Sequence, residues 1–383
     1  MLTIGYIFIS IFSLFFFGLP LACLLGTKGK DPEEKWIIAP FLGLSLIVLV
    51  LQNLVYLDIP IGRSFLWLWI GAALIWVWLW KSGRWPFSPF PLLLLAVALG
   101  AYLIQGAGLL AAGAEAYVGR AWHDFFNYTA IAQFLTDYPF HSAIQEVQNQ
   151  PYLFAAIIKK ADRIGPSILQ GFLAASTGVS AKTAFMPTMF LSSFLTVLAI
   201  YGLARKLLLS SKWALLAGAA AGVLPALALV ELESFFSQAL VIPFLFIWPL
   251  LLSEYLRHPT WQRALVSALV LATGTSLYTE FFPIFLAVAL FGFLSEAFGK
   301  RKNILTASLS LILMIGFALL LNVGFFQGII AICQRVANSN VLSGIYPWAY
   351  ATEGLQRLWL GDLAVRFPLA AQFFRPITYF LIG

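Results

Sequence analysis

Ten long apolar stretches follow one another along this chain of 383 residues, and every second connection between them is short and rich in Lys and Arg. Most of the stretches have the roughly 17–25 residues that a helix needs to cross about 30 Å of hydrocarbon. Hydrophobic residues make up 61% of the chain and charged residues only 10%, which is more apolar surface than a soluble core can bury. The sequence therefore predicts an all-α polytopic membrane protein with about ten transmembrane helices.

The first predicted span is too long for the apolar core of a secretory signal peptide and follows no basic segment, so we expect it to be retained. The eighth and ninth spans are short and nearly continuous, with a break around residues 278–280. Cys23 and Cys333 indicate no disulfide framework. The predicted spans are residues 2–26, 36–57, 64–80, 90–113, 184–204, 213–231, 235–256, 264–279, 281–298 and 304–332.

The basic connections predict the orientation of the chain in the membrane. They follow the first, third, fifth, seventh and ninth spans, and short loops rich in Lys and Arg are typical of the cytoplasmic side. The N-terminus and the other connections are then non-cytoplasmic, in a plasma, inner or endoplasmic reticulum membrane. The net charge of +7 is spread over these loops instead of forming one patch, which favours a lipid bilayer and not a nucleic acid as the partner.

Two non-cytoplasmic segments are long, residues 114–183 and residues 333–376. The first of them contains two short apolar segments, 121–137 and 166–177, that we expect to form juxtamembrane helices along the membrane surface. The residues expected on the apolar side of the earlier helix are Trp122, Phe125, Phe126, Ile131 and Phe134.

The earlier of these helices carries a polar group. Asp124, Asn127 and Tyr128 share one helix face at spacings of three and four, next to His123. A carboxylate held by such neighbours at the mouth of an apolar cavity is a candidate general base, or a ligand for a divalent cation such as Mg²⁺ or Mn²⁺. The alternative is an Arg120–Asp124 ion pair that only stabilises a surface helix.

Further acidic residues end other apolar stretches on the same predicted side. Glu231 and Glu233 end the sixth stretch, where two carboxylates can hold a divalent cation that neutralises a diphosphate leaving group. The alternative is a solvated loop. Glu280 lies between the eighth and ninth stretches, where a carboxylate below the headgroups needs a partner or a water-filled cavity. The alternative is an ordinary turn residue.

Basic residues on the same side are candidates for binding phosphate, because the guanidinium group of Arg matches a pair of phosphate oxygens. The alternative is that they anchor the chain at the membrane interface. The candidates are Arg120, Lys159, Lys160, Arg163 and Arg335.

The order of these features resembles the GT-C superfamily of integral-membrane glycosyltransferases, which use lipid-phosphate-linked sugars. In that superfamily a long first outer loop carries an acidic residue near its start and two juxtamembrane helices. Here Asp124 takes the acidic position as a single acid, and Asp124-x-x-Asn127-Tyr128 is similar to the family's acid-then-Tyr pattern. Glu231 and Glu233 match a second acidic motif of some members, and Glu280 falls in an outer loop that contributes in others.

The resemblance implies three N-terminal helices over 1–89, a seven-span module over 90–332 and a further outer segment over 333–383. It also implies transfer of a sugar, with inversion, from a polyprenyl-phosphate-linked donor to a glycan, lipid or protein acceptor on the non-cytoplasmic side. Asp124 would deprotonate or orient the acceptor hydroxyl. Two alternatives stay open: a lipid-linked oligosaccharide flippase or other transporter, and a non-catalytic membrane assembly subunit.

Overall fold

The computed structural model describes residues 2–25, 33–83, 91–117, 119, 122–143, 149–153, 156–157, 164–207, 210–299, 304–324 and 326. All of them belong to the first of two units of the chain, Met1–Ile329. Their regular structure is helical, and no β-strand occurs among them. Seven helices in this part are long and apolar enough to cross a membrane. The chain is therefore a multi-pass helical membrane protein.

Most helices follow the predicted spans, but the last described helix ends at Leu321, whereas the tenth span was predicted to reach residue 332. In chain order they are α1 (Leu2–Leu24), α2 (Glu34–Tyr56), α3 (Ile61–Lys81), α4 (Leu92–Gln105), α5 (Ala107–Ala112), α6 (Trp122–Asp137), the 3-10 helix η2 (Pro151–Leu153), α8 (Ile164–Thr177), α9 (Ala181–Met189), α10 (Leu191–Lys206), α11 (Ser211–Gly222), α12 (Pro225–Leu232), α13 (Phe236–Arg257), α14 (Trp261–Leu277), the 3-10 helix η3 (Thr279–Phe281), α15 (Phe282–Gly299) and α16 (Ile304–Leu321).

Only part of the predicted set of ten spans has the length of a full crossing. The seven candidates are α1, α2, α3, α13 and three pairs, namely α9 with α10, α11 with α12, and η3 with most of α15. The apolar helices α4 and α16 are shorter, and α14 has 17 residues. The predicted break between the eighth and ninth spans is confirmed as η3, which separates α14 from α15.

Two of the predicted spans are interrupted helices. Phe190 separates α9 from α10, close to Pro187, and residues 223–224 separate α11 from α12. α12 begins at Pro225, and proline suits the first turn of a helix because its missing N–H has no partner to lose there. The second interruption sets the direction of α12 and of the acidic residues at its end.

α1 and α2 pack closely where Gly18 faces Gly43. A Cβ atom at Gly18 would lie 1.7 Å from the carbonyl oxygen of Ala39, and one at Gly43 would lie 1.9 Å from that of Leu14. Small residues let membrane helices approach until their backbones touch, which adds dispersion contacts where no hydrophobic driving force exists. The two glycines therefore fix α1 against α2.

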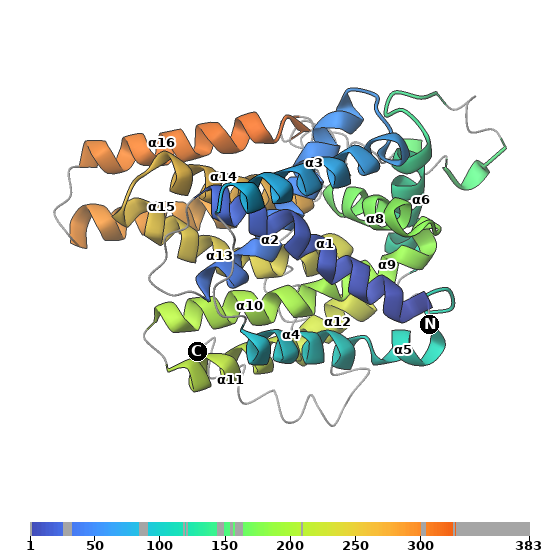
Figure 1. Ribbon diagram of the computed structural model, residues 1–383, viewed down its shortest axis with the longest axis horizontal. Helices are drawn as coiled ribbons and strands as arrows, with labels where there is room; N and C mark the ends of the chain where they lie inside the picture. The colour runs from blue at the N-terminus through green and yellow to red at the C-terminus, as the bar shows by residue number, and fades with distance from the viewer. Residues whose placement is uncertain are drawn as a thin grey trace, which may run out of the picture. The chain divides into compact units, whose positions relative to one another are not determined.

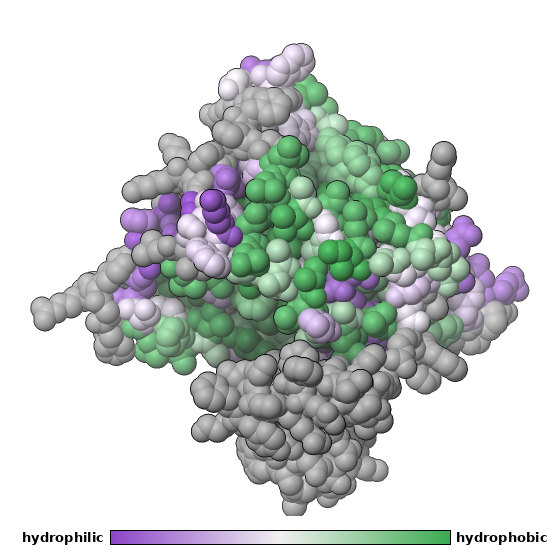
Figure 2. All heavy atoms as spheres, turned by 90° about the horizontal axis from the view of Figure 1, so that it is seen from below, coloured by the Kyte–Doolittle hydropathy of each residue, from purple (hydrophilic) through white to green (hydrophobic). Residues whose placement is uncertain are grey.

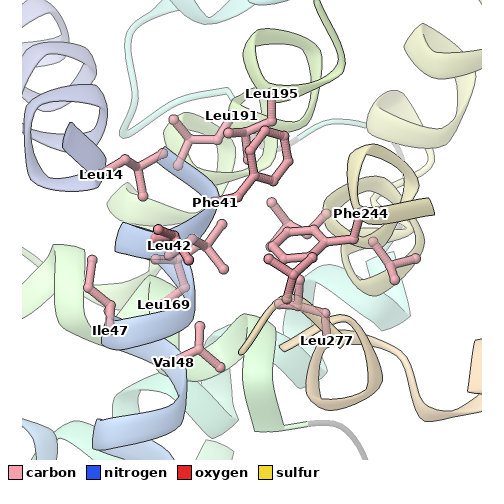
Figure 3. Packing of buried hydrophobic residues seen from close by; sticks show 14 of the residues in the cluster. Leu14, Phe41, Leu42, Ile47, Val48, Leu169, Leu191, Leu195, Phe244 and Leu277 are labelled. Carbon is pink, nitrogen blue, oxygen red and sulfur yellow. The ribbon is translucent and has the colours of Figure 1, made fainter. Parts of the chain in front are cut away.

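One buried core includes the N-terminal helices and those that follow. Figure 3 shows Leu14 of α1 and Phe41 of α2 packed with Leu191 of α10 and Phe244 of α13. The rings of Phe41 and Phe244 meet edge to face, with centroids 5.4 Å apart. This core holds the helix ends that carry the candidate site.

Apolar side chains also cover much of the outside. Trp67 and Trp80 on α3 are 71% and 68% exposed, and Phe291 on α15 is 75% exposed. Figure 2 shows apolar residues over the middle of one face, with hydrophilic residues toward its left and right edges. Exposed apolar surface of this extent suits contact with lipid.

The two short helices predicted between the fourth and fifth spans occur as α6 and α8, which lie together at the right of Figure 1. α8 is not a two-sided surface helix, because every residue from Ile164 to Ala174 is buried. It packs against α2, α3, α6 and α14. On α6, Ile131 and Phe134 are buried inside the protein, whereas Phe126, which was predicted on the same apolar side, is 45% exposed.

Candidate functional site

The first half of α6 is held against the turn between α12 and α13. The hydroxyls of Tyr128 and Ser237 form a hydrogen bond of 2.5 Å, in which either oxygen can donate. The ring of Tyr128 packs edge to face on Phe236, with centroids 5.4 Å apart. From α8, Ser167 donates a hydrogen bond of 3.1 Å to the carbonyl oxygen of Tyr128. Tyr128 therefore positions the start of α6.

Gly119 meets the same turn. Its φ of +70° lies in the left-handed region that glycine adopts readily. A Cβ atom here would lie 2.9 Å from the carbonyl oxygen of Leu232 and 3.0 Å from Ser234 Oγ. Ser234 has a φ of +58°, which is uncommon for a residue with a side chain. Gly119 thus fits closely against a strained turn, and backbone strain of this kind gathers at functional sites.

Asp124 lies in the first turn of α6, one helical turn before Tyr128 and on the same face. Its side chain is half-buried and makes no hydrogen bond or ion pair with another described residue. Asn127, also half-buried, lies beside it. His123 belongs to α6, but its side chain lies outside the description. The helix thus holds the backbone of Asp124, and its carboxylate is still accessible to a ligand.

Glu231 faces α10 instead. It is fully buried, and its Oε1 atom accepts hydrogen bonds from the hydroxyls of Ser192 and Ser193, the second at 2.5 Å. Its Oε2 atom has no hydrogen-bond partner among the described residues. Burial raises the pKa of the nearby Tyr117 phenol, and the Glu231 carboxylate raises it further.

Glu233 and Glu280 lie on the two elements next to this turn. Glu233 is half-buried and directly follows α12. Residues two positions apart along a helix point about 200° apart around its axis, so Glu233 points away from Glu231. Glu280 is half-buried in η3. η3 lies beside the start of α13, since Gln238 donates a hydrogen bond of 3.4 Å to the Tyr278 hydroxyl. The elements that carry Asp124, Glu233 and Glu280 therefore meet around the first turn of α13.

The predicted phosphate-binding residues lie outside the described part of the chain. In the sequence, Arg120 directly follows Gly119, and Arg163 directly precedes the first residue of α8. The others are Lys159, Lys160 and Arg335.

The described carboxylates do not assemble into a metal site. Within residues 2–326, apart from the gaps given above, no group of three or more His, Cys, Asp or Glu side chains lies close enough to hold a metal ion. The turn of α12 explains part of this, because it directs Glu231 toward two serine hydroxyls and away from Glu233. The predicted Mg²⁺ or Mn²⁺ site therefore finds no support in the geometry of the described residues.

Sequence reasoning missed the serines of this region. Ser192 and Ser193 are adjacent polar residues inside an apolar stretch, and polar side chains at membrane depth need partners. From this pair of serines, a polar partner for α10, such as Glu231, could have been predicted. Ser237 carried no comparable signal, because its partner Tyr128 is distant in the sequence.

Comparisons with protein-family models, curated proteins and solved structures found no match for this chain. The class is therefore defined by the fold: a multi-pass helical membrane protein in which helix ends bearing acidic residues meet at the start of α13.

Proposed function

We propose that this protein is a membrane glycosyltransferase that moves a sugar from a polyprenyl-phosphate-linked donor to an acceptor hydroxyl on the non-cytoplasmic side. The observation that carries the proposal is the position of Asp124. It is half-buried, accessible and one turn from the Tyr128–Ser237 hydrogen bond that holds its helix. A general base needs both properties, because it must reach the proton that it removes and stay in place while it does so.

In the reaction, the acceptor oxygen attacks the anomeric carbon while its proton passes to a carboxylate oxygen of Asp124. The bond between the anomeric carbon and the phosphate oxygen breaks, and its electron pair leaves with the polyprenyl phosphate. Direct displacement inverts the configuration. Arg120 and Arg163, which adjoin the described site in sequence, are the candidates for stabilising the negative charge on the departing phosphate.

An apolar groove supports a lipid-linked donor. It has a volume of about 820 Å³, and its lining is apolar throughout, with Trp76, Leu99 and Phe194 contributed by α3, α4 and α10. Along α1 the lining extends from Ile4 to Leu19, which is roughly 22 Å at 1.5 Å per helical residue. A groove of this length and composition can hold part of a polyprenyl chain.

A transporter is the second candidate, and Glu231 is the observation that favours it. A buried carboxylate at the end of a membrane-spanning pair of helices, with one oxygen bonded to two serine hydroxyls, is typical of proton or cation coupling sites. Transport would then use Glu231, whereas sugar transfer would use Asp124.

The test compares both activities of the purified full-length protein. Sugar transfer is measured in detergent with a series of polyprenyl-phosphate sugars, and flux of the same compounds is measured in sealed vesicles. We expect transfer with at least one donor and an inverted product. Flux without transfer for every donor would contradict the proposal and favour a transporter. Absence of both flux and transfer would contradict it and favour an assembly subunit.

A further inference from the structure

A cavity lies between the helix ends that adjoin the basic connections. It has a volume of about 460 Å³ and is formed by the start of α2, the end of α10, the end of α13 and the start of α14. Sites for small molecules usually have volumes of about 300–1,000 Å³. The cavity is therefore large enough for a ligand, and neither proposed activity uses it.

The lining of this cavity is positively charged. Arg205, Lys206, Arg257 and Arg263 line it, against the two carboxylates of Glu34 and Glu254. Lys206 forms an ion pair with Glu254.

A second cation of the lining, Arg257, pairs with a carboxylate that does not line the cavity. Arg257 Nε lies 3.3 Å from Glu296 Oε1. Arg263 donates a hydrogen bond of 3.2 Å to the carbonyl oxygen of His258 but makes no ion pair with any described residue. Among the residues that line the cavity, the four Lys and Arg side chains outnumber the two carboxylates, and Arg263 is available to a ligand.

Positive-inside topology and favourable contacts with helix C-termini explain why basic residues occur at this end. They do not explain a second feature of the cavity wall. Ser267 is 1% exposed and lines the cavity, and its Oγ atom has no hydrogen-bond partner within the described residues. A buried hydroxyl without a partner is costly, and a ligand oxygen would satisfy it.

We propose that this cavity binds a phosphate group, with Arg263 and Ser267 as donors to its oxygens. Arg and a hydroxyl together supply charge and directed hydrogen bonds to phosphate. Apolar side chains, among them Ile37, Leu250 and Val266, form other parts of the wall. This combination suits the phosphate of an anionic phospholipid, since basic pockets between membrane helices bind such headgroups. The site is independent of sugar transfer.

The experiment measures binding by the full-length protein in zwitterionic micelles. In one arm a short-chain anionic phospholipid is titrated, with a zwitterionic phospholipid of the same chains as its control, and in the other arm inorganic phosphate is titrated. We expect saturable binding of the anionic lipid and weaker binding of inorganic phosphate. Comparable binding of phosphate alone would support a site for a soluble phosphate compound. Absence of binding in both arms, or equal binding of a zwitterionic lipid, would overturn the proposal.

Variants locate the site. Arg263→Gln should weaken binding by about fivefold, the effect of one cation near a membrane surface, and Arg263→Lys should restore most of it. Lys212→Gln is the matched control, because Lys212 is exposed and does not line the cavity. Equal affinities of the two Gln variants would overturn the assignment.

A second pair of variants tests the wall of the cavity. Ser267→Ala should weaken binding by about tenfold, because a hydrogen bond to a charged group is lost. Ser45→Ala is the control, since Ser45 has an equally buried hydroxyl without a described partner and lies away from the cavity. If Arg263→Gln does not fold, the two Ala variants still test whether the ligand binds in this cavity. Equal affinities of the Ala variants would contradict the role of Ser267.

Discussion

The Tyr128 hydroxyl on α6 lies 2.5 Å from Ser237 Oγ at the start of α13, although 109 positions separate the two residues in the chain. Both residues are buried, so the hydrogen bond is shielded from water. Asp124 lies one turn earlier on the same helix face. The contact therefore determines where the Asp124 carboxylate can reach.

Tyr128→Phe should lower the free energy of unfolding by about 1–3 kcal/mol, because it leaves the buried Ser237 hydroxyl without this partner. It should also reduce sugar transfer, since the start of α6 loses an anchor. Thermal unfolding in detergent and transfer rates measure the two effects. Tyr138→Phe is the control, because the Tyr138 hydroxyl makes no hydrogen bond within the described residues. Identical unfolding of the two variants would contradict the anchoring role.

Glu231→Gln separates the two candidate functions. Glutamine keeps an oxygen that accepts from Ser192 and Ser193, so the fold should survive. If Asp124 is the base, transfer should stay within about tenfold of the wild type, well short of the 10²–10⁴-fold that general-base catalysis typically supplies. The variant is assayed for transfer and for flux in sealed vesicles. Loss of flux in a protein that never transfers sugar would point to the transporter.

Gly43→Ala and Gly100→Ala should have opposite effects on stability. A methyl group at Gly43 would overlap the Leu14 carbonyl oxygen at 1.9 Å, and overpacking of this kind costs about 1–3 kcal/mol or more. Nothing lies within 4 Å of a Cβ at Gly100, so the higher helix propensity of Ala should stabilise α4 by up to about 1 kcal/mol. Thermal unfolding of both variants in detergent is the measurement. Stabilisation by Gly43→Ala would show that α1 and α2 are not in this contact.

The apolar stretches predicted most of the helices, because hydropathy and the length of a span are local properties of the sequence. The segments 121–137 and 166–177 became α6 and α8 within two residues at each end. Burial of α8 could not be read from the sequence, because it depends on which helices surround it. Its Gln170 side chain reaches the carbonyl oxygen of Ala181, a partner that only the folded chain provides.

In the candidate site, too, the positions of residues along the helices could be predicted from the sequence, but their contacts could not. The positions of Asp124 and Glu231 at helix ends followed from the spans, whereas the direction of each carboxylate depended on the break before Pro225 and on packing. Glu231 was expected on the same side of the membrane as Asp124, but the sequence did not predict that Glu231 accepts hydrogen bonds from Ser192 and Ser193 on α10.

The orientation in the membrane is tested by cysteine labelling in a background without Cys23 and Cys333. Asn149→Cys and Ser211→Cys place thiols at exposed positions in connections that are predicted to face opposite sides. An impermeant thiol reagent should label position 149 in intact cells and position 211 only after permeabilisation. Labelling of position 211 alone in intact cells would reverse the predicted orientation.

Asp124→Asn, compared with Asp137→Asn, tests the proposed chemistry most directly. Asp137 ends the same helix roughly 20 Å away, is exposed, and accepts a hydrogen bond of 2.7 Å from Gln133. With a donor that the wild type uses, Asp124→Asn should lower kcat by at least about a hundredfold while the unfolding temperature stays near that of the wild type. Asp137→Asn should transfer sugar at the wild-type rate. Transfer at the wild-type rate by a folded Asp124→Asn protein would contradict the assignment of Asp124 as the base.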